Sequence, residues 1–340
     1  MRYIGIDCHK EFCQASVVNE KGEELLNERV PTKRKTILEF LKRFKDDKPN
    51  TTFVLESTVR WRMVYDIIAG QGFSVTVAHP KGVKMIATSK VKTDKVDANT
   101  LANLFRVDMI PEAYVARSEA LRWRKIVRHR FFLVNEATSI KNRIHSELRE
   151  DGIDVPKHIA KPFSQKGKDW MRSLHLLLVD DLLDCLNEIE MRLKDIDRVI
   201  EDECADSYEA RRINDVPGIG AYTALTLMAE IDLIDRFPSP ETICSYFGLV
   251  PSVSQSGSSC HRGPITKQGS PMVRFLLVEC VHIHTEWCPV SRISKFLAKK
   301  EKEIGRQKAA VAAARKLLVA IYFMLKRDEP FRGLEPDLEV

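Results

Sequence analysis

Short apolar runs separated by polar turns dominate the first hundred residues. Runs at residues 3–6, 12–18 and 24–30 predict three strands, and Asn19-Glu20-Lys21-Gly22 predicts a turn between the second and the third. These strands are expected to form an antiparallel meander. Two later apolar runs, at residues 52–55 and 73–78, predict two further strands.

Helical periodicity alternates with these strands. Ile37, Phe40, Leu41 and Phe44 recur at helical spacing behind Thr32, which is expected to cap the helix. A second helix is predicted at 61–69, before the break Gly70-Gln71-Gly72, and a third at 97–105. Residues 81–95 read as a lysine-rich connection. Alternating strands and helices favour parallel pairing in a layered α/β sheet.

The middle of the chain has a longer helical repeat. Its apolar residues follow a 3-4 spacing over three heptads: Val179, Leu182, Leu186, Ile189, Leu193, Ile196 and Ile200. Such a helix forms a coiled coil with a second copy, or it packs on its own chain, and the repeat is too short to decide between them. The predicted helix at 118–149 is a candidate antiparallel partner within one chain.

Two glycines lie near the start of the last third of the chain. Val216-Pro217-Gly218-Ile219-Gly220 precedes a helix-like run that continues to Ile231. This resembles a helix-hairpin-helix element, in which backbone N–H groups and a helix N-terminus bind a DNA phosphate. An ordinary turn between helices is the alternative.

Composition narrows the class of protein. The chain has 340 residues, of which 44% are hydrophobic and 30% are charged. This length and this composition exclude a disordered protein and a disulfide-stapled mini-protein. No apolar stretch is long enough to span a membrane, and the start shows no secretory signal, so the expected location is the cytoplasm. The eight scattered cysteines are expected to be reduced thiols.

Charge is unevenly distributed. The net charge is only +6, but residues 117–149 carry +6, residues 180–209 carry −9 and residues 289–327 carry +9. Basic segments of this kind favour a polyanionic partner.

Four acids stand at positions where side chains meet in an α/β sheet. Asp7 and Glu56 end two predicted strands, and Asp94 and Asp97 lie at the start of a helix. Taken singly, each is a surface acid or a helix cap. Together they would repel one another unless a cation intervened, and oxygen ligands suit Mg²⁺. Two such ions support phosphodiester chemistry.

The motifs around these acids carry a family resemblance. Tyr3-Ile4-Gly5-Ile6-Asp7, Leu55-Glu56-Ser57-Thr58 and Lys92-Thr93-Asp94-Lys95-Val96-Asp97-Ala98 resemble the RNase H/RuvC-like domain of the DEDD insertion-sequence transposases. Phe247-Gly248-Leu249-Val250-Pro251, Ser256-Gly257 and residues 262–269 resemble the C-terminal domain of the same family. That family includes the Piv DNA invertases and the bridge-RNA-guided recombinases.

The resemblance implies a mechanism. Asp7, Glu56, Asp94 and Asp97 would bind Mg²⁺, and Ser256 would attack a DNA phosphate and form a phosphoserine intermediate. Spacing alone does not distinguish Ser256 from the serines around it; the family's Ser-Gly pair does. Arg262 and Lys267 would hold the scissile phosphate. Implied partners are donor and target double-stranded DNA, a bridge RNA, and further copies of the chain in a dimer or tetramer.

Other clusters have two interpretations. Aromatic residues alternate with basic ones in a segment that suits nucleic-acid contact, or that forms a helix with a solvated basic face: Arg122, Trp123, Arg124, Lys125, Arg128, Arg130, Phe131 and Phe132. The basic C-terminal segment, with Lys295, Lys299 and Lys302, has the same two interpretations. Cys280, His284 and Cys288 are expected to be packing residues, with zinc as the alternative.

The sequence thus predicts an α/β plus α protein. Residues 1–116 are expected to form a RuvC-like mixed sheet with the metal site, 117–209 a helical coiled-coil region, and 210–340 a mostly helical transposase domain with the nucleophilic serine. The predicted function is an RNA-guided DNA transposase or recombinase. The alternatives are a guide-free invertase, a junction-resolving nuclease and a non-catalytic scaffold. Val59 and Trp61 depart from the glycine and tyrosine usual in the family, which leaves the loop after Glu56 in doubt.

Overall fold

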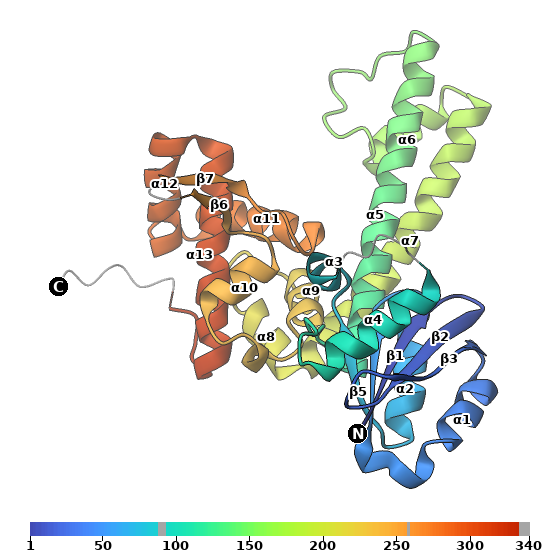
Figure 1. Cartoon of the computed structure of the whole chain (residues 1–340). Helices are drawn as coiled ribbons and strands as arrows, with labels where there is room; N and C mark the ends of the chain where they lie inside the picture. The colour runs from blue at the N-terminus through green and yellow to red at the C-terminus, as the bar shows by residue number, and fades with distance from the viewer. Residues whose placement is uncertain (88–92, 257–258, 333–340) are drawn as a thin grey trace, which may run out of the picture. The chain divides into compact units, whose positions relative to one another are not determined.

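The structure is a computed structural model that describes residues 1–87, 93–256 and 259–332. The chain divides into two compact units. The N-terminal unit comprises Met1–Val115 and the C-terminal unit Ala116–Val340. Figure 1 shows a sheet with helices in the first unit and mostly helices in the second.

A five-stranded mixed sheet organises the N-terminal unit. Its strands are β1 (Arg2–Cys8), β2 (Phe12–Val18), β3 (Glu24–Pro31), β4 (Thr51–Glu56) and β5 (Ser74–Ala78). The order is β3-β2-β1-β4-β5. The first three strands form the expected antiparallel meander, and β4 runs parallel to both β1 and β5. The fold class of an α/β sheet with parallel pairs is therefore confirmed.

Helices cover the two faces of this sheet. On one face, Ile4, Ile6 and Cys8 pack with α1 (Arg34–Lys42) and α2 (Trp61–Gly70). On the other, Val54 and Ala78 pack against Leu101 of α4 (Asp94–Arg106). Because alternate residues of a strand point to opposite faces, Gly5 and Asp7 share the face covered by α4. A 3-10 helix (Lys45–Asn50) leads into β4, and a short helix α3 (Pro80–Ile86) follows β5.

Local predictions near the site need three corrections. Thr32 does not cap α1: the N-cap residue is Lys33, and the buried Thr32 hydroxyl instead donates to the carbonyl oxygen of His9 at 3.0 Å. The lysine-rich connection contains α3. Helix α4 begins at Asp94, three residues earlier than expected, because Thr93 caps it by accepting a hydrogen bond from the Val96 N–H.

Two long helices pair in the C-terminal unit, α5 (Ser118–Glu150) and α7 (Leu177–Asp206), with α6 (Gln165–Arg172) between them in sequence. Contacts run in opposite directions along them: Trp123 with Glu203, Arg130 with Asp197 and Lys141 with Glu190. The pair is therefore antiparallel, as Figure 1 shows. Its apolar seam includes Ile144, Leu183 and Leu186, so the heptad residues of α7 pack on their own chain.

The rest of the described C-terminal unit is a helical cluster with a β-hairpin. Its helices are α8 (Tyr208–Asn214), α9 (Ala221–Ile231), α10 (Pro240–Tyr246), α11 (Pro271–Trp287), α12 (Arg292–Ile304) and α13 (Arg306–Arg327), with a 3-10 turn at Ile234–Arg236. Strands β6 (Pro251–Ser256) and β7 (Ser259–Ile265) form the antiparallel hairpin. Cys280 and His284 are buried, as expected of packing residues. Among the described residues, no helix is long and apolar enough to cross a membrane.

Candidate active site

A close approach of strand and helix creates the acidic site. A Cβ on Gly5 would lie 2.2 Å from the carbonyl oxygen of Ala98 and 2.6 Å from the backbone nitrogen of Ala102. Only glycine lets β1 and α4 come this close. The same face carries buried polar side chains, Asp7, Gln14 and Ser16. The first turn of α4 is therefore held above the end of β1, where Asp7 lies.

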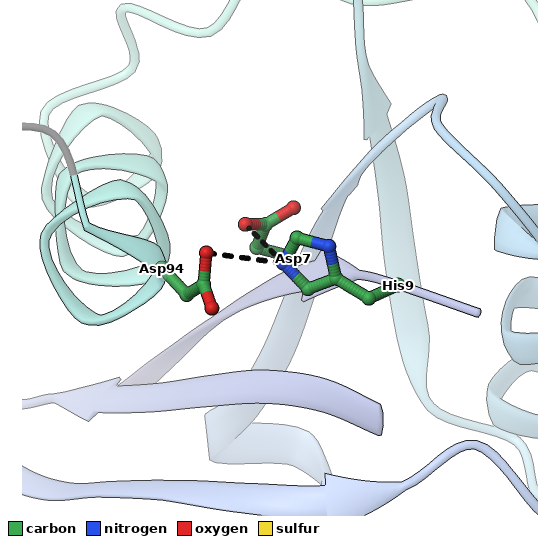
Figure 2. Close-up of side chains that lie close together, drawn as sticks. All are labelled: Asp7, His9 and Asp94. Carbon is green, nitrogen blue, oxygen red and sulfur yellow. Dashed lines mark ion pairs between the residues drawn. The ribbon is translucent and has the colours of Figure 1, made fainter. Parts of the chain in front are cut away.

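Asp7, His9 and Asp94 converge at this end of the sheet, as Figure 2 shows. The Nε2 atom of His9 lies 3.1 Å from Oδ2 of Asp7 and 3.4 Å from Oδ1 of Asp94. One donor atom from each residue falls within 4.8 Å of the others. The group therefore has the spacing of ligands around a single ion.

Glu56 and Asp97 border this group. Parallel pairing of Ile6 with Leu55 puts Glu56, the last residue of β4, beside Asp7 on the face that α4 covers. Asp97 lies in the first turn of α4, where the positive end of the helix dipole favours an acid. The structure thus gathers the predicted acids at one edge of the sheet. Of the four acids, Asp7 and Asp94 have donor atoms in the convergent group with His9, and Glu56 and Asp97 do not.

The electrostatics of Asp7 favour a bound cation. Burial raises the pKa of its carboxyl group above the ordinary value, and the nearby charges of Asp97 and Asp94 raise that pKa further, whereas His9 opposes the shift. A buried carboxylate whose neighbours are also acidic is costly without a counter-charge. Asp7, Asp94 and His9 offer two oxygens and one nitrogen, and this donor set fits a divalent cation.

Sequence reasoning missed His9 and Arg29. His9 follows Asp7 by two residues, and in an extended chain residues two apart share a face, so that spacing was an available signal. Arg29 comes from β3, and its Nη2 atom lies 3.7 Å from Oδ2 of Asp94. That contact depends on strand order, which the local sequence does not specify.

The predicted nucleophile lies in the β6–β7 hairpin. Ser256 ends β6 and pairs with Ser259 of β7, so these two serines belong to the strands of a hairpin, as do Ser252 and Ser254. The side chains of Ser256 and Arg262, and the whole of Gly257, lie outside the described residues. In the described part, the Ser252 hydroxyl donates to the carbonyl oxygen of Pro264 at 3.1 Å.

The segment after this hairpin is fixed by Arg274. Its guanidinium donates to the carbonyl oxygens of Phe247, Gln268 and Gly269, at 3.1, 2.8 and 3.3 Å. Lys267, the predicted phosphate contact, is exposed and has a φ of 55°. Its backbone is therefore held in a left-handed turn by neighbours, while its side chain is free to reach solvent.

The basic residues of α5 mostly face acids of their own unit. Arg122 pairs with Glu203, Arg130 with Asp197 at 2.8 Å, and both Arg124 and Arg128 with Glu230, at 3.4 and 2.8 Å. The side chain of Glu230 is only 6% exposed. Lys125 is exposed. Most of the predicted nucleic-acid contacts on α5 thus already hold the helices together.

The two glycines of the predicted hairpin differ. Gly218 is buried, has a φ of 90°, and a Cβ there would lie 2.7 Å from the backbone nitrogen of His284 in α11. Gly220 is exposed, is the N-cap of α9 and has open space around its Cβ position. Gly218 therefore has a packing role, and Gly220 alone of the two presents backbone to solvent.

Family models match both halves of the chain. A model of DEDD type for IS110 elements, described as a transposase, matches residues 4–151. A second, described as the transposase IS116/IS110/IS902 family, matches residues 210–298. The chain belongs to the IS110 family of transposases. It is accordingly an enzyme of DNA transposition or recombination.

Individual relatives extend this match over nearly the whole transposase. The transposase for insertion sequence element IS1111A of Coxiella burnetii is 24% identical, over 98% of this chain and 92% of its own length. The transposase for element IS1328 of Yersinia enterocolitica is 24% identical, over 83% and 84%. The pilin gene-inverting protein of Moraxella lacunata is 23% identical, over 97% of each chain.

The loop in which this transposase departs from the family pattern keeps its link to the site. Val59 is exposed, and the left-handed residue of the loop is Arg60, with a φ of 60°. Trp61 begins α2 and packs edge-on to Tyr65. The Thr58 hydroxyl donates to the carbonyl oxygen of Cys8 at 2.8 Å. The loop after Glu56 is thereby tied to the end of β1, next to Asp7.

Proposed function

We propose that this transposase cuts and rejoins donor and target DNA strands through a phosphoserine intermediate, with a divalent cation at the acids of an RNase H/RuvC-like N-terminal unit. The observation that carries the proposal is the convergence of Asp7 and Asp94 at the edge of the mixed sheet, beside Glu56. Mg²⁺ is the ion that the sequence predicts. When bound, such a cation lowers the cost of charge on the phosphate and on the leaving oxygen.

The proposed role of Ser256 is covalent. Its hydroxyl loses its proton as Oγ attacks a DNA phosphorus, so a P–Oγ bond forms while the bond from phosphorus to one deoxyribose oxygen breaks, and the departing oxygen takes up a proton. A hydroxyl of the other DNA then attacks the phosphoserine. That step forms the new phosphodiester bond and returns the serine hydroxyl. Lys267 and Arg262 are proposed to hold the phosphate during both steps.

The acids and the serine come from different units of the chain, Met1–Val115 and Ala116–Val340. The proposal therefore requires the two units, from one copy or from two, to meet on the DNA. We propose that the α5–α7 pair within residues 117–209 is an intrachain coiled coil whose outer surface joins copies, and that residues 210–340 form the serine-bearing domain. A bridge RNA that pairs with both DNAs completes the proposal.

The decisive experiment compares serines of one hairpin. DNA containing the ends of the element and a target site is incubated with the wild-type chain, Ser256→Ala or Ser252→Ala, and products are separated under denaturing conditions. Covalent protein–DNA adducts and recombinants should vanish for Ser256→Ala and persist for Ser252→Ala. Full recombination by Ser256→Ala would overturn the nucleophile assignment. Loss of all products in Asp7→Ala is expected from the same assay.

A guide-free invertase is the second candidate, favoured by the similarity to the pilin gene-inverting protein over 97% of each chain. The two differ in their need for RNA. Sequencing RNA that copurifies with the chain, and repeating the reaction after ribonuclease treatment, separates them. A discrete RNA whose removal stops recombination supports the guided mechanism, whereas full activity without RNA supports the invertase.

A further inference from the structure

His9 is built into the acidic site rather than lying near it by chance. Its backbone N–H donates to the carbonyl oxygen of Phe12 at 2.9 Å, and its own carbonyl oxygen accepts the hydroxyl of Thr32. Its ring packs against Phe12, with 4.9 Å between centroids. The imidazole is therefore held from the backbone side and from one ring face, which fixes the direction of Nε2.

That nitrogen points at the two carboxylates. In Figure 2, Nε2 of His9 faces Asp7 and Asp94 from the end of β1. The atom itself is shielded from solvent, and its neighbours within the described residues are the two carboxylates, at ion-pair distance. A shielded ring nitrogen aimed into an acidic cluster suits an ion pair with the carboxylates, and it equally suits a ligand of a cation bound between them.

The separations of the donor atoms agree with this role. Ligands about 2.1 Å from a six-coordinate cation lie about 3 Å apart when they occupy adjacent corners of the octahedron. The nitrogen of His9 is 3.1 Å from the oxygen of Asp7 and 3.4 Å from that of Asp94. Each carboxylate can thus share an edge of one octahedron with the imidazole after shifts of a few tenths of an ångström.

We propose that His9 is a nitrogen ligand of the proposed cation, so that the site binds a first-row transition-metal dication such as Mn²⁺ more tightly than Mg²⁺. The chemistry of the donors carries the preference. Mg²⁺ favours oxygen ligands, whereas imidazole strengthens binding of the transition-metal ions. This inference rests on the proposed function, because it takes Asp7 and Asp94 as ligands of the same ion. It adds a residue and an ion preference that the four acids do not supply.

The test measures binding directly on the full-length, metal-free protein. Mn²⁺ affinity is followed by the loss of the free-ion electron paramagnetic resonance signal, and Mg²⁺ affinity by calorimetry. Pulsed spectra of bound Mn²⁺ report whether a ¹⁴N nucleus is coordinated. The variants are His9→Ala, His9→Asn and Asp7→Asn. His79→Asn is the matched control, because His79 caps α3 through its ring nitrogen and asparagine keeps a capping oxygen.

The wild-type protein and His79→Asn should show the ¹⁴N signal and bind Mn²⁺ more tightly than Mg²⁺. His9→Ala and His9→Asn should lose that signal, and their Mn²⁺ affinity should fall about tenfold or more, with little change for Mg²⁺. Absence of the ¹⁴N signal in the wild-type protein would overturn the proposal. So would unchanged Mn²⁺ affinity in both His9 variants, or tighter binding of both ions, which would make His9 a competitor of the cation.

Asp7→Asn separates this inference from the proposed function. If Asp7→Asn abolishes binding of both ions while the His9 variants leave binding unchanged, the acidic site stands and only the role of His9 fails. If Asp7→Asn also leaves the affinities for both ions unchanged, the proposed metal site itself is wrong. Circular dichroism of each metal-free variant establishes that it is folded.

Discussion

Gly5 of β1 touches the backbone of Ala98 in α4 so closely that an added Cβ would lie 2.2 Å from the Ala98 carbonyl oxygen. The contact brings the first turn of α4 over the strand end that carries Asp7. The spacing of Asp7 and Asp94, the proposed cation ligands, thus depends on a contact made two residues before Asp7 and one helical turn after Asp94. A residue without a side chain sets the width of the site.

Gly5→Ala should therefore damage both stability and cation binding. Because the neighbouring atoms are backbone, the helix must shift, and overpacking of this kind costs about 1 to 3 kcal/mol. Gly70→Ala is the control, since Gly70 ends α2 and has no atom within 4 Å of its Cβ position. Chemical denaturation and Mn²⁺ titration measure the two effects. Equal stability and equal affinity for both variants would contradict the role of the contact.

Asp7→Asn should stabilise the metal-free protein at neutral pH. Burial raises the pKa of Asp7, so the stability linked to its proton is complete below the ordinary value of 3.8 and is lost as pH rises through the folded pKa. The variant removes that loss. Its melting temperature should exceed that of the wild-type protein near pH 7, and the difference should disappear below pH 3.8.

Added divalent cation should reverse this order. A cation that binds only the folded state raises stability by mass action, and the variant lacks Asp7, one of the proposed cation ligands. The wild-type melting temperature should therefore rise with Mn²⁺ or Mg²⁺, whereas that of Asp7→Asn should not. A variant that is less stable near pH 7 without metal would show that the contact with His9 outweighs the burial of Asp7.

Gly218→Ala should lower stability, whereas Gly220→Ala should leave stability unchanged. Gly218 has a φ of 90° and lies against α11, so a methyl group there meets backbone and should cost at least about 1 kcal/mol. Gly220 has open space and should tolerate alanine. Thermal melts measure stability, and DNA titrations measure affinity. Weaker DNA binding by a fully stable Gly220→Ala supports the phosphate-binding hairpin, and unchanged binding favours an ordinary turn.

Substitutions of lysines in α12 should weaken nucleic-acid binding, whereas substitutions of arginines in α5 should lower stability. Lys295, Lys299 and Lys302 are exposed, so changing all three to glutamine should leave the melting temperature unchanged. Nucleic-acid affinity should weaken, and the slope of its salt dependence should decrease by about one for each phosphate that the three lysines neutralise.

Replacing both Arg124 and Arg128 with glutamine should instead lower the free energy of unfolding by about 3 kcal/mol. The change leaves the buried carboxylate of Glu230 without its ion-pair partners on α5. The comparison is made by thermal melts and by binding at several salt concentrations. If the arginine variants are stable but no longer bind nucleic acid, the main nucleic-acid contact lies on α5.

Much of the fold follows from short-range patterns. The meander and the parallel strands were predictable because β-branched and apolar runs are bounded by turn residues, as at Asn19-Glu20-Lys21-Gly22. Helix α7 was predictable from its 3-4 spacing. The start of α4 was missed because Asp94 reads equally well as a turn residue until Thr93 is seen to cap the helix. Helix α3 was missed because its short, lysine-rich sequence carries little periodicity.

The site was only partly predictable. Asp7 and Glu56 could be placed at strand ends, and their proximity followed from parallel pairing. His9 could have been placed at the site from its spacing two residues after Asp7. Arg29 reaches the site only through strand order, which is a tertiary property. The pairing of the α5 arginines was hidden for the same reason, since Glu203 and Glu230 lie far along the chain from their partners.

The antiparallel pairing of α5 with α7 places a basic and an acidic segment side by side. Residues 117–149 and 180–209 carry +6 and −9, so side by side they form an arm with a net negative charge. Residues 289–327, in the same unit, keep +9. The excess positive charge of the C-terminal unit therefore lies on α12 and α13. We therefore expect a polyanionic partner to be attracted to α12 and α13 rather than to the arm, at a rate that falls as the salt concentration rises.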